Sequence, residues 1–133
     1  MPNLPIVALY AGLHGLILLW LAATVSRIRW RTGIWLGDGG SEELVRATRG
    51  LANFAEYVPL VLLMMLLLAG LGMPGYLLLV FGLTLTAARI LHGLHFAGVL
   101  DTVVARQVGA SVTFVVVLLA SLGLVVHAVM QLA

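Results

Sequence analysis

Four long apolar stretches constrain the fold of this chain more than any other feature. The predicted spans cover approximately residues 4–25, 44–71, 75–98 and 107–130, and the apolar part of the second span begins at about residue 51. Each can cross a bilayer as a helix, which takes about 20 predominantly apolar residues. Only 9% of the chain is charged, whereas a soluble domain carries about 25%. The sequence therefore predicts an all-α integral membrane protein, folded as one four-helix bundle over residues 1–133, and argues against a soluble enzyme.

The positions of the charges predict how the bundle lies in the membrane. All seven basic residues are arginine, and every charged residue lies within residues 27–56 or 89–106. Because arginines gather on the cytoplasmic side, loops at about residues 27–43 and 97–107 are expected there, with both termini on the opposite side. The chain start has no basic residue before the first apolar stretch, which favours a retained segment over a signal peptide.

Composition also limits the chemistry. The chain has no cysteine, so it supplies neither a thiol nor a thiolate ligand for zinc. A nucleic-acid partner is not expected, because that needs a basic face on a folded surface. The abundance of arginine, alanine and glycine without lysine is typical of a GC-rich bacterial genome. We therefore expect a multi-pass protein of a bacterial inner membrane.

A polar stripe is predicted on the second helix. Ser41 is a good N-cap and two glutamates follow it, which predicts a helix over residues 42–70. At 100° per residue, its polar positions fall on one face about 100° wide. Glu56 must point into the bundle or into a cavity between subunits, because lipid solvates a carboxylate poorly. The stripe consists of Arg46, Arg49, Asn53, Glu56 and Tyr57.

The third and fourth stretches carry matching charges. Arg89, His92 and Phe96 lie within about 60° on a helix, and Arg106 falls in the following loop or in the first turn of the fourth helix. A cation at a helix N-terminus is disfavoured by the helix dipole, and a bound anion would explain it. The combined groups suit a ligand with two carboxylates and one ammonium group, such as glutathione, whose thiolate a guanidinium would stabilise.

These residues resemble a known family. The spacing Arg46-x-x-Arg49-x-x-x-Asn53-x-x-Glu56-Tyr57-x-Pro59 is similar to the helix-two signature of the membrane-associated proteins in eicosanoid and glutathione metabolism, the MAPEG family. Arg89-x-x-His92-x-x-x-Phe96 resembles the helix-three signature. The resemblance covers nearly the whole chain and implies a homotrimer that binds glutathione between subunits near the cytoplasmic face.

The resemblance also assigns roles to residues. Arg106 matches the arginine that activates the thiol of glutathione, and Arg27 matches a loop arginine of the site. Phe96 departs from the pattern, because several members carry tyrosine there. The expected activity is conjugation of glutathione to a lipophilic electrophile from the membrane lipid, or reduction of a hydroperoxide. The other positions expected to bind glutathione are Arg46, Arg49, Asn53, Glu56, Tyr57, Arg89 and His92.

Simpler interpretations remain open at this point. Arg46 and Arg49 could be interfacial side chains that extend towards water, and Glu56 could pair with Arg49 or Arg89 as a structural bridge. His14 is expected to bond between helices, and His95 to face the interface. Two other functions compete with the enzyme: a non-catalytic lipid-binding protein of the same fold, or a small multidrug transporter. The transporter is disfavoured, because the first apolar stretch contains no carboxylate.

Overall fold

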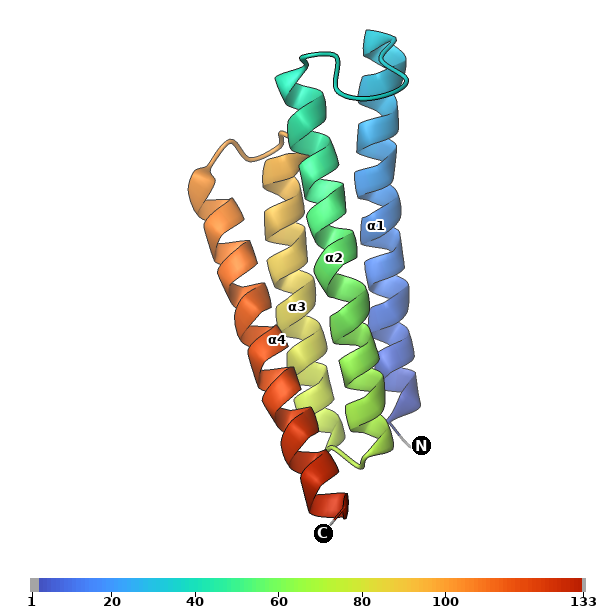
Figure 1. Ribbon diagram of the computed structural model, residues 1–133, viewed down its shortest axis with the longest axis vertical. Helices are drawn as coiled ribbons and strands as arrows, with labels where there is room; N and C mark the ends of the chain where they lie inside the picture. Colours follow the sequence, from blue (N-terminus) through green and yellow to red (C-terminus); the bar gives the residue numbers. More distant parts are fainter. Residues whose placement is uncertain (1–2, 133) are drawn as a thin grey trace.

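The computed structural model describes residues 3–132, which form four α-helices that run alternately up and down (Figure 1). The helices are long and apolar enough to cross a membrane. The all-α four-helix prediction is therefore confirmed. The helices are α1 (Leu4–Thr32), α2 (Glu42–Gly70), α3 (Gly75–Phe96) and α4 (Val103–Leu132).

Helix α1 continues about two turns beyond its expected span. Its last turns carry Arg27, Arg29 and Arg31, so the expectation that these arginines occupy a loop is wrong. Ile28 stays buried against α2, which keeps the extension helical despite its charges. The helix ends at Gly33, which adopts a left-handed conformation (φ 69°) and donates its N–H to the carbonyl of Arg29.

The starts of α2 and α4 are both set by hydroxyl caps. Ser41 Oγ accepts from the N–H of Leu44 at 3.3 Å, as the sequence predicted. Thr102 Oγ1 accepts from the N–H of Ala105 at 3.1 Å. Helix α4 consequently begins at Val103, several residues before its expected start. The loop between α3 and α4 is thus short, and Arg106 lies on the helix.

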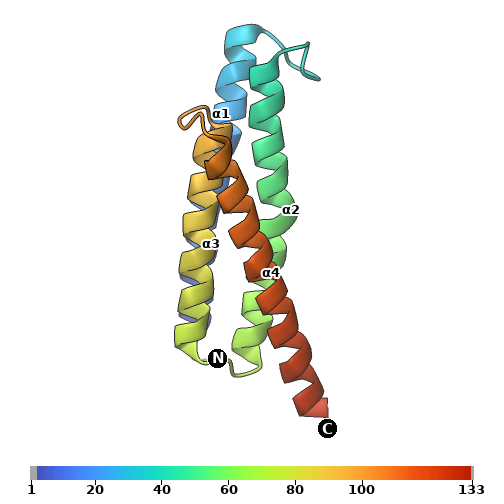
Figure 2. The same cartoon turned by 90° about the vertical axis from the view of Figure 1, so that its left-hand side faces the viewer.

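The two polar loops lie at one end of the bundle. Residues 33–41 and 97–102 share this end, whereas the described chain ends lie at the other (Figures 1 and 2). The shared location of the termini agrees with the four-span topology. Which side of the membrane they face stays a prediction.

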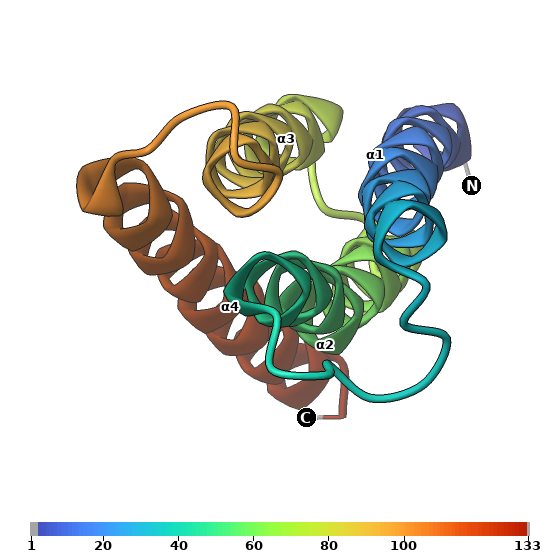
Figure 3. The ribbon, with the colours of Figure 1, turned by 90° about the horizontal axis from the view of Figure 1, so that it is seen from above.

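Helix α4 crosses the bundle obliquely. Its C-terminal half approaches α2, where Gly123 lies opposite Leu68 and Met73. Its N-terminal end stands away from α2, which the view along the bundle shows directly (Figure 3). Helices α2 and α3 contact all the others, whereas α1 and α4 do not touch. The divergence of α4 from α2 leaves an opening at the loop end.

Candidate functional site

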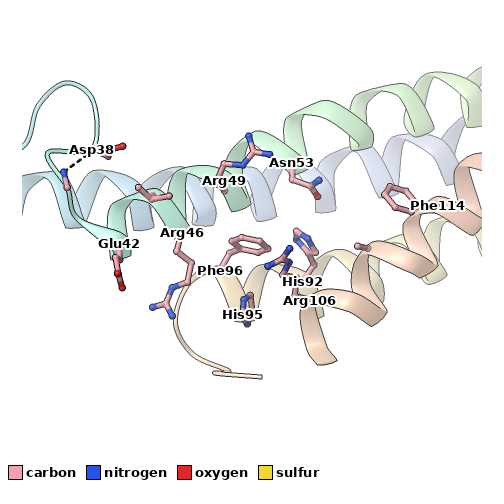
Figure 4. A pocket seen from close by; sticks show the side chains of 13 residues that line it. Asp38, Glu42, Arg46, Arg49, Asn53, His92, His95, Phe96, Arg106 and Phe114 are labelled. Carbon is pink, nitrogen blue, oxygen red and sulfur yellow. Dashed lines mark hydrogen bonds between the residues drawn. The ribbon is translucent and has the colours of Figure 1, made fainter. Parts of the chain in front are cut away.

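A cavity of about 700 Å³ occupies this opening. Its walls come from the N-terminal half of α2, the last turns of α3 and the first three turns of α4, and the loop before α2 covers part of its mouth (Figure 4). The lining polar and aromatic side chains are Asp38, Glu42, Arg46, Arg49, Asn53, His92, His95, Phe96, Arg106 and Phe114.

Phe96 forms part of the wall of this cavity. Its ring centroid is 4.7 Å from that of His92 and 5.1 Å from that of His95. The guanidinium carbon of Arg106 lies 6.0 Å from the ring centroid, within cation–π range. The ring can approach α2 because residue 50 is glycine: a Cβ there would meet Phe96 Cγ at 2.7 Å. Phe96 thus fixes one side of Arg106 (Figure 4).

A buried arginine lies next to the cavity wall. Arg89 is only 1% exposed, and its Nη2 donates to Asn53 Oδ1 at 2.9 Å and to His92 Nδ1 at 2.8 Å. Its Nη1 lies 3.4 Å from Thr113 Oγ1. All of these partners are neutral groups, and two of them line the cavity. The positive charge of Arg89 therefore has no carboxylate partner within residues 3–132.

The contact with Arg89 determines which nitrogen of the neutral His92 ring carries the hydrogen. A guanidinium group only donates hydrogen bonds, so His92 Nδ1 must accept. The ring hydrogen of a neutral His92 is then on Nε2. His92 consequently offers an N–H donor on the opposite edge of a ring that lines the cavity.

Most of the predicted site residues come together in or beside the cavity. Arg46, Arg49, Asn53, His92, Phe96 and Arg106 line it directly. Arg89 lies behind its wall. Tyr57 contacts the lining residue Phe114 edge to face, with ring centroids 5.4 Å apart. The predicted clustering of arginines is therefore present within a single subunit.

Two other predicted residues, Arg27 and Glu56, lie neither in the lining of this cavity nor directly behind it. Arg27 lines a smaller neighbouring cavity. Glu56 is exposed on the outer face of α2 and has no ion pair within the described residues, 3–132. The interpretation of Glu56 as a bridge to Arg49 or Arg89 is thus wrong for one subunit. Of the two directions expected for Glu56, the structure excludes the interior of its own bundle.

Other lining residues were missed from the sequence. Asp38 and Glu42 supply the carboxylates at the cavity mouth. His95, expected at the interface, is only 9% exposed and lines the cavity. His14, expected to bond between helices, instead places Nδ1 2.7 Å from the carbonyl oxygen of Tyr10 in its own helix. The sequence offered one indication for Asp38: its loop was expected at the same end of the bundle as the loop between the third and fourth helices.

The charges suit an organic anion better than a metal. Three arginines and two carboxylates line the cavity, and Arg89 adds a fourth cation behind them. Within residues 3–132, no three histidine, aspartate or glutamate side chains converge as metal ligands. Guanidinium groups bind carboxylates with paired, charge-assisted hydrogen bonds. The arrangement favours a ligand with several carboxylates and a separate cationic group for the acidic mouth.

Comparison with known proteins identifies a family and two similar bacterial proteins. The MAPEG family profile matches residues 7–126. Inner membrane protein YecN of Escherichia coli strain K12 is 36% identical over 90 residues, which span 66% of this chain and 69% of YecN. YecN of Escherichia coli O6:H1 strain CFT073 matches with the same values. The profile match includes every residue of the cavity lining.

Proposed function

The chain belongs to the MAPEG family and is a multi-pass protein of the inner membrane, and we propose that it is a glutathione-dependent enzyme. Its substrates are glutathione and a lipophilic electrophile that enters from the lipid. The observation that carries this proposal is the convergence of Arg46, Arg49 and Arg106 on one cavity beside the uncompensated charge of Arg89. The carboxylates of glutathione would supply the missing negative charge.

The two ends of the cavity suit the two kinds of charge on glutathione. Its carboxylates would bind the arginines, with Asn53 as a polar neighbour. Its ammonium group would face Asp38 or Glu42 at the mouth. An arrangement with both signs of charge distinguishes a zwitterionic ligand from a simple anion. In this proposal Asp38 and Glu42 of the same subunit, rather than Glu56, supply the negative charge of the site.

Arg106 is the residue proposed to activate the thiol. It lies in the first turns of α4, where the helix dipole disfavours a cation, and its guanidinium lies over Phe96. Beside that guanidinium the thiol releases its proton to water, and the thiolate sulfur attacks an electrophilic carbon. A C–S bond forms, and the substrate either loses an anionic leaving group or takes up a proton.

His92 provides a donor that Phe96 lacks. A tyrosine hydroxyl at position 96 would give a hydrogen bond to the sulfur, whereas phenylalanine cannot. The Nε2–H of His92, fixed by Arg89, belongs to the ring stacked next to Phe96. We assign this N–H as a second donor to the thiolate. The alternative is a non-catalytic lipid-binding member of the family, and the missing hydroxyl is the feature that favours it.

Assembly as a homotrimer is part of the proposal, and Glu56 supports it. This carboxylate is exposed on the surface of the isolated subunit, although it lies in the apolar part of α2. A carboxylate that faces lipid costs several kcal/mol, and a neighbouring subunit removes that cost if it brings a donor. Both termini are proposed to lie on the non-cytoplasmic side, which places the cavity at the cytoplasmic face.

The experiment that tests the function is titration of the purified protein with glutathione, followed by calorimetry and by thiolate absorbance. A free thiol has a pKa of about 8.5, so about 3% is ionised near pH 7. Stabilising the thiolate by about 2.7 kcal/mol lowers that pKa by about 2 units and ionises most of the bound thiol. Wild-type protein should therefore show a strong thiolate band near neutral pH. Binding without any thiolate band would favour the non-catalytic alternative.

Variants at two arginines separate binding from chemistry. Arg106→Ala should abolish the thiolate band and slow conjugation, while glutathione still binds within a few fold. Arg106→Lys should recover part of the rate, because a point charge lacks the planar fork. Arg49→Ala is the matched charge deletion, and it should weaken binding by about 1.5–3 kcal/mol. A full thiolate band in Arg106→Ala would transfer the activating role to another group.

A further inference from the structure

A second cavity, of about 290 Å³, lies beside the first one between α1, α2 and α3. We call it the basic cavity. Arg46 and Phe96 line both cavities and form the wall between them. Three arginines contribute to the lining of the basic cavity. The residues that matter here are Trp20, Thr24, Arg27, Arg31, Glu43 and Arg46.

The arginines of the basic cavity are only partly neutralised. Glu43 is its one acidic lining residue, and it is already paired with Arg31. Arg46 lies 4.0 Å from the carboxylate of Asp101, which is 93% exposed and thus a weak partner. Within residues 3–132 Arg27 has no ion pair. The cavity therefore has an excess of two positive charges over its single carboxylate.

A buried polar atom of Arg46 indicates an acceptor in one of the two cavities. The Nε of Arg46 is shielded from solvent, yet it has no hydrogen-bond partner within the described chain. A buried N–H without a partner is unfavourable, and native proteins rarely leave one. Because Arg46 lines both cavities, an acceptor in either could satisfy this N–H. Arg27, in contrast, lines only the basic cavity.

The position of the basic cavity along the bundle favours a lipid as the source of the anion. It lies at the end of the bundle that carries the charged loops, and Trp20 and Thr24 mark its side towards the membrane centre. Tryptophan is enriched at the level of lipid head groups. Basic pockets between transmembrane helices bind anionic lipid head groups. A volume below half that of the first cavity suits a phosphate and its glycerol better than a tripeptide.

We propose that the basic cavity binds the phosphate of an anionic phospholipid, held by Arg27, Arg31 and Arg46. Guanidinium groups match phosphate oxygens with paired hydrogen bonds. Trp20 contacts the first apolar carbons of the lipid. Within one subunit, Arg27 lines this cavity and not the glutathione cavity. The site does not depend on the proposed enzymatic function.

Native mass spectrometry in a neutral detergent tests this site. Wild-type protein is mixed with phosphatidylglycerol, with phosphatidylcholine, or with inorganic phosphate. We expect phosphatidylglycerol to remain bound in preference to phosphatidylcholine. Arg27→Ala should lower its retention about tenfold or more, because a charge-assisted hydrogen bond is lost. Arg27→Lys should keep part of it. Arg106→Ala, which removes the same charge at the same end but from the other cavity, should retain the lipid as wild type does.

Several results would overturn the proposal. If Arg27→Ala and Arg106→Ala lose the lipid equally, the net charge of the protein alone attracts the anionic lipid, and no specific site is involved. Inorganic phosphate that displaces the lipid at equal concentration would refute the lipid as the source. A thermal unfolding curve shows whether Arg27→Ala is folded. If it is not, Arg27→Lys replaces it in the comparison. Wild-type protein that retains phosphatidylglycerol no better than phosphatidylcholine would refute the site. Wild-type protein that keeps the lipid but binds no glutathione would refute only the enzymatic function.

Discussion

Replacing Gly109 with alanine should disrupt the site without removing any functional group. Gly109 lies on α4 three residues after Arg106, where α4 meets α3. A Cβ at this position would lie 2.7 Å from the carbonyl oxygen of Ala88 and 2.7 Å from His92 Cβ. The carbonyl oxygen of Ala88 is a backbone atom, so it cannot rotate away as a side chain could. Helix α4 must therefore move as a body, or α3 must bend.

The size of the effect follows from these distances. Ordinary contacts of a Cβ begin at 3.4 Å, so α4 must move about 0.7 Å away from α3. Overpacking of this kind costs about 1–3 kcal/mol, while alanine regains about 0.5–1 kcal/mol of helix propensity. The net loss in the free energy of unfolding is about 0–2.5 kcal/mol. Because Arg106 moves with α4, conjugation should slow by up to about 100-fold, as for misplacements of about 1 Å.

Gly123→Ala is the matched control on the same helix. A Cβ at Gly123 meets only the ends of two flexible side chains, Leu68 Cδ2 and Met73 Cε, each at 3.6 Å. This variant should unfold at the same temperature as wild type or slightly above it, and it should retain full activity. Thermal unfolding in detergent and the thiolate band are measured for both variants. Equal stability and equal thiolate signals in the two would refute the close packing of α4 against α3.

Two further predictions concern assembly. Mass measurement in detergent should give a trimer, and a stable monomer would contradict the proposed assembly. Glu56→Gln should loosen the trimer, because its carboxylate is exposed on one subunit and needs a partner there. It should leave glutathione binding unchanged, because the proposed cavity lies within one subunit. Weaker binding of glutathione, but not of an analogue without the γ-glutamyl ammonium, would show that Glu56 contacts that ammonium group.

The sequence predicted the helices and much of the site because both depend on helical periodicity. Arg46, Arg49 and Asn53 share a face at 100° per residue, and that face does line the cavity. The same calculation placed Glu56 with them, although it lies on the exposed side of α2. A stripe about 100° wide spans the boundary between the cavity and the outer surface. Periodicity alone cannot locate that boundary, because it depends on the tilt of α4.

Residues outside the predicted spans were harder to place. Arg27 was expected in a loop that approaches the ligand, but α1 stays helical beyond it and directs it to the basic cavity. Asp38 reaches the first cavity through a loop whose turns depend on glycines with positive φ, such as Gly37 and Gly39. A loop of this kind has no periodicity from which a direction can be calculated. Its contribution becomes visible only in three dimensions.

The surroundings of Arg89 fit a cavity that binds a charged ligand better than they fit helix packing alone. A buried guanidinium is costly unless its charge is compensated, and hydrophobic residues would pack α3 against α2 and α4 without that cost. Yet Arg89 is 1% exposed and contacts neutral groups, two of which face the cavity. Its charge can be balanced from the cavity side, through the lining formed by Asn53 and His92. An anion bound there would stabilise the buried charge and be stabilised by it, so ligand binding and the packing of α3 would depend on the same residue.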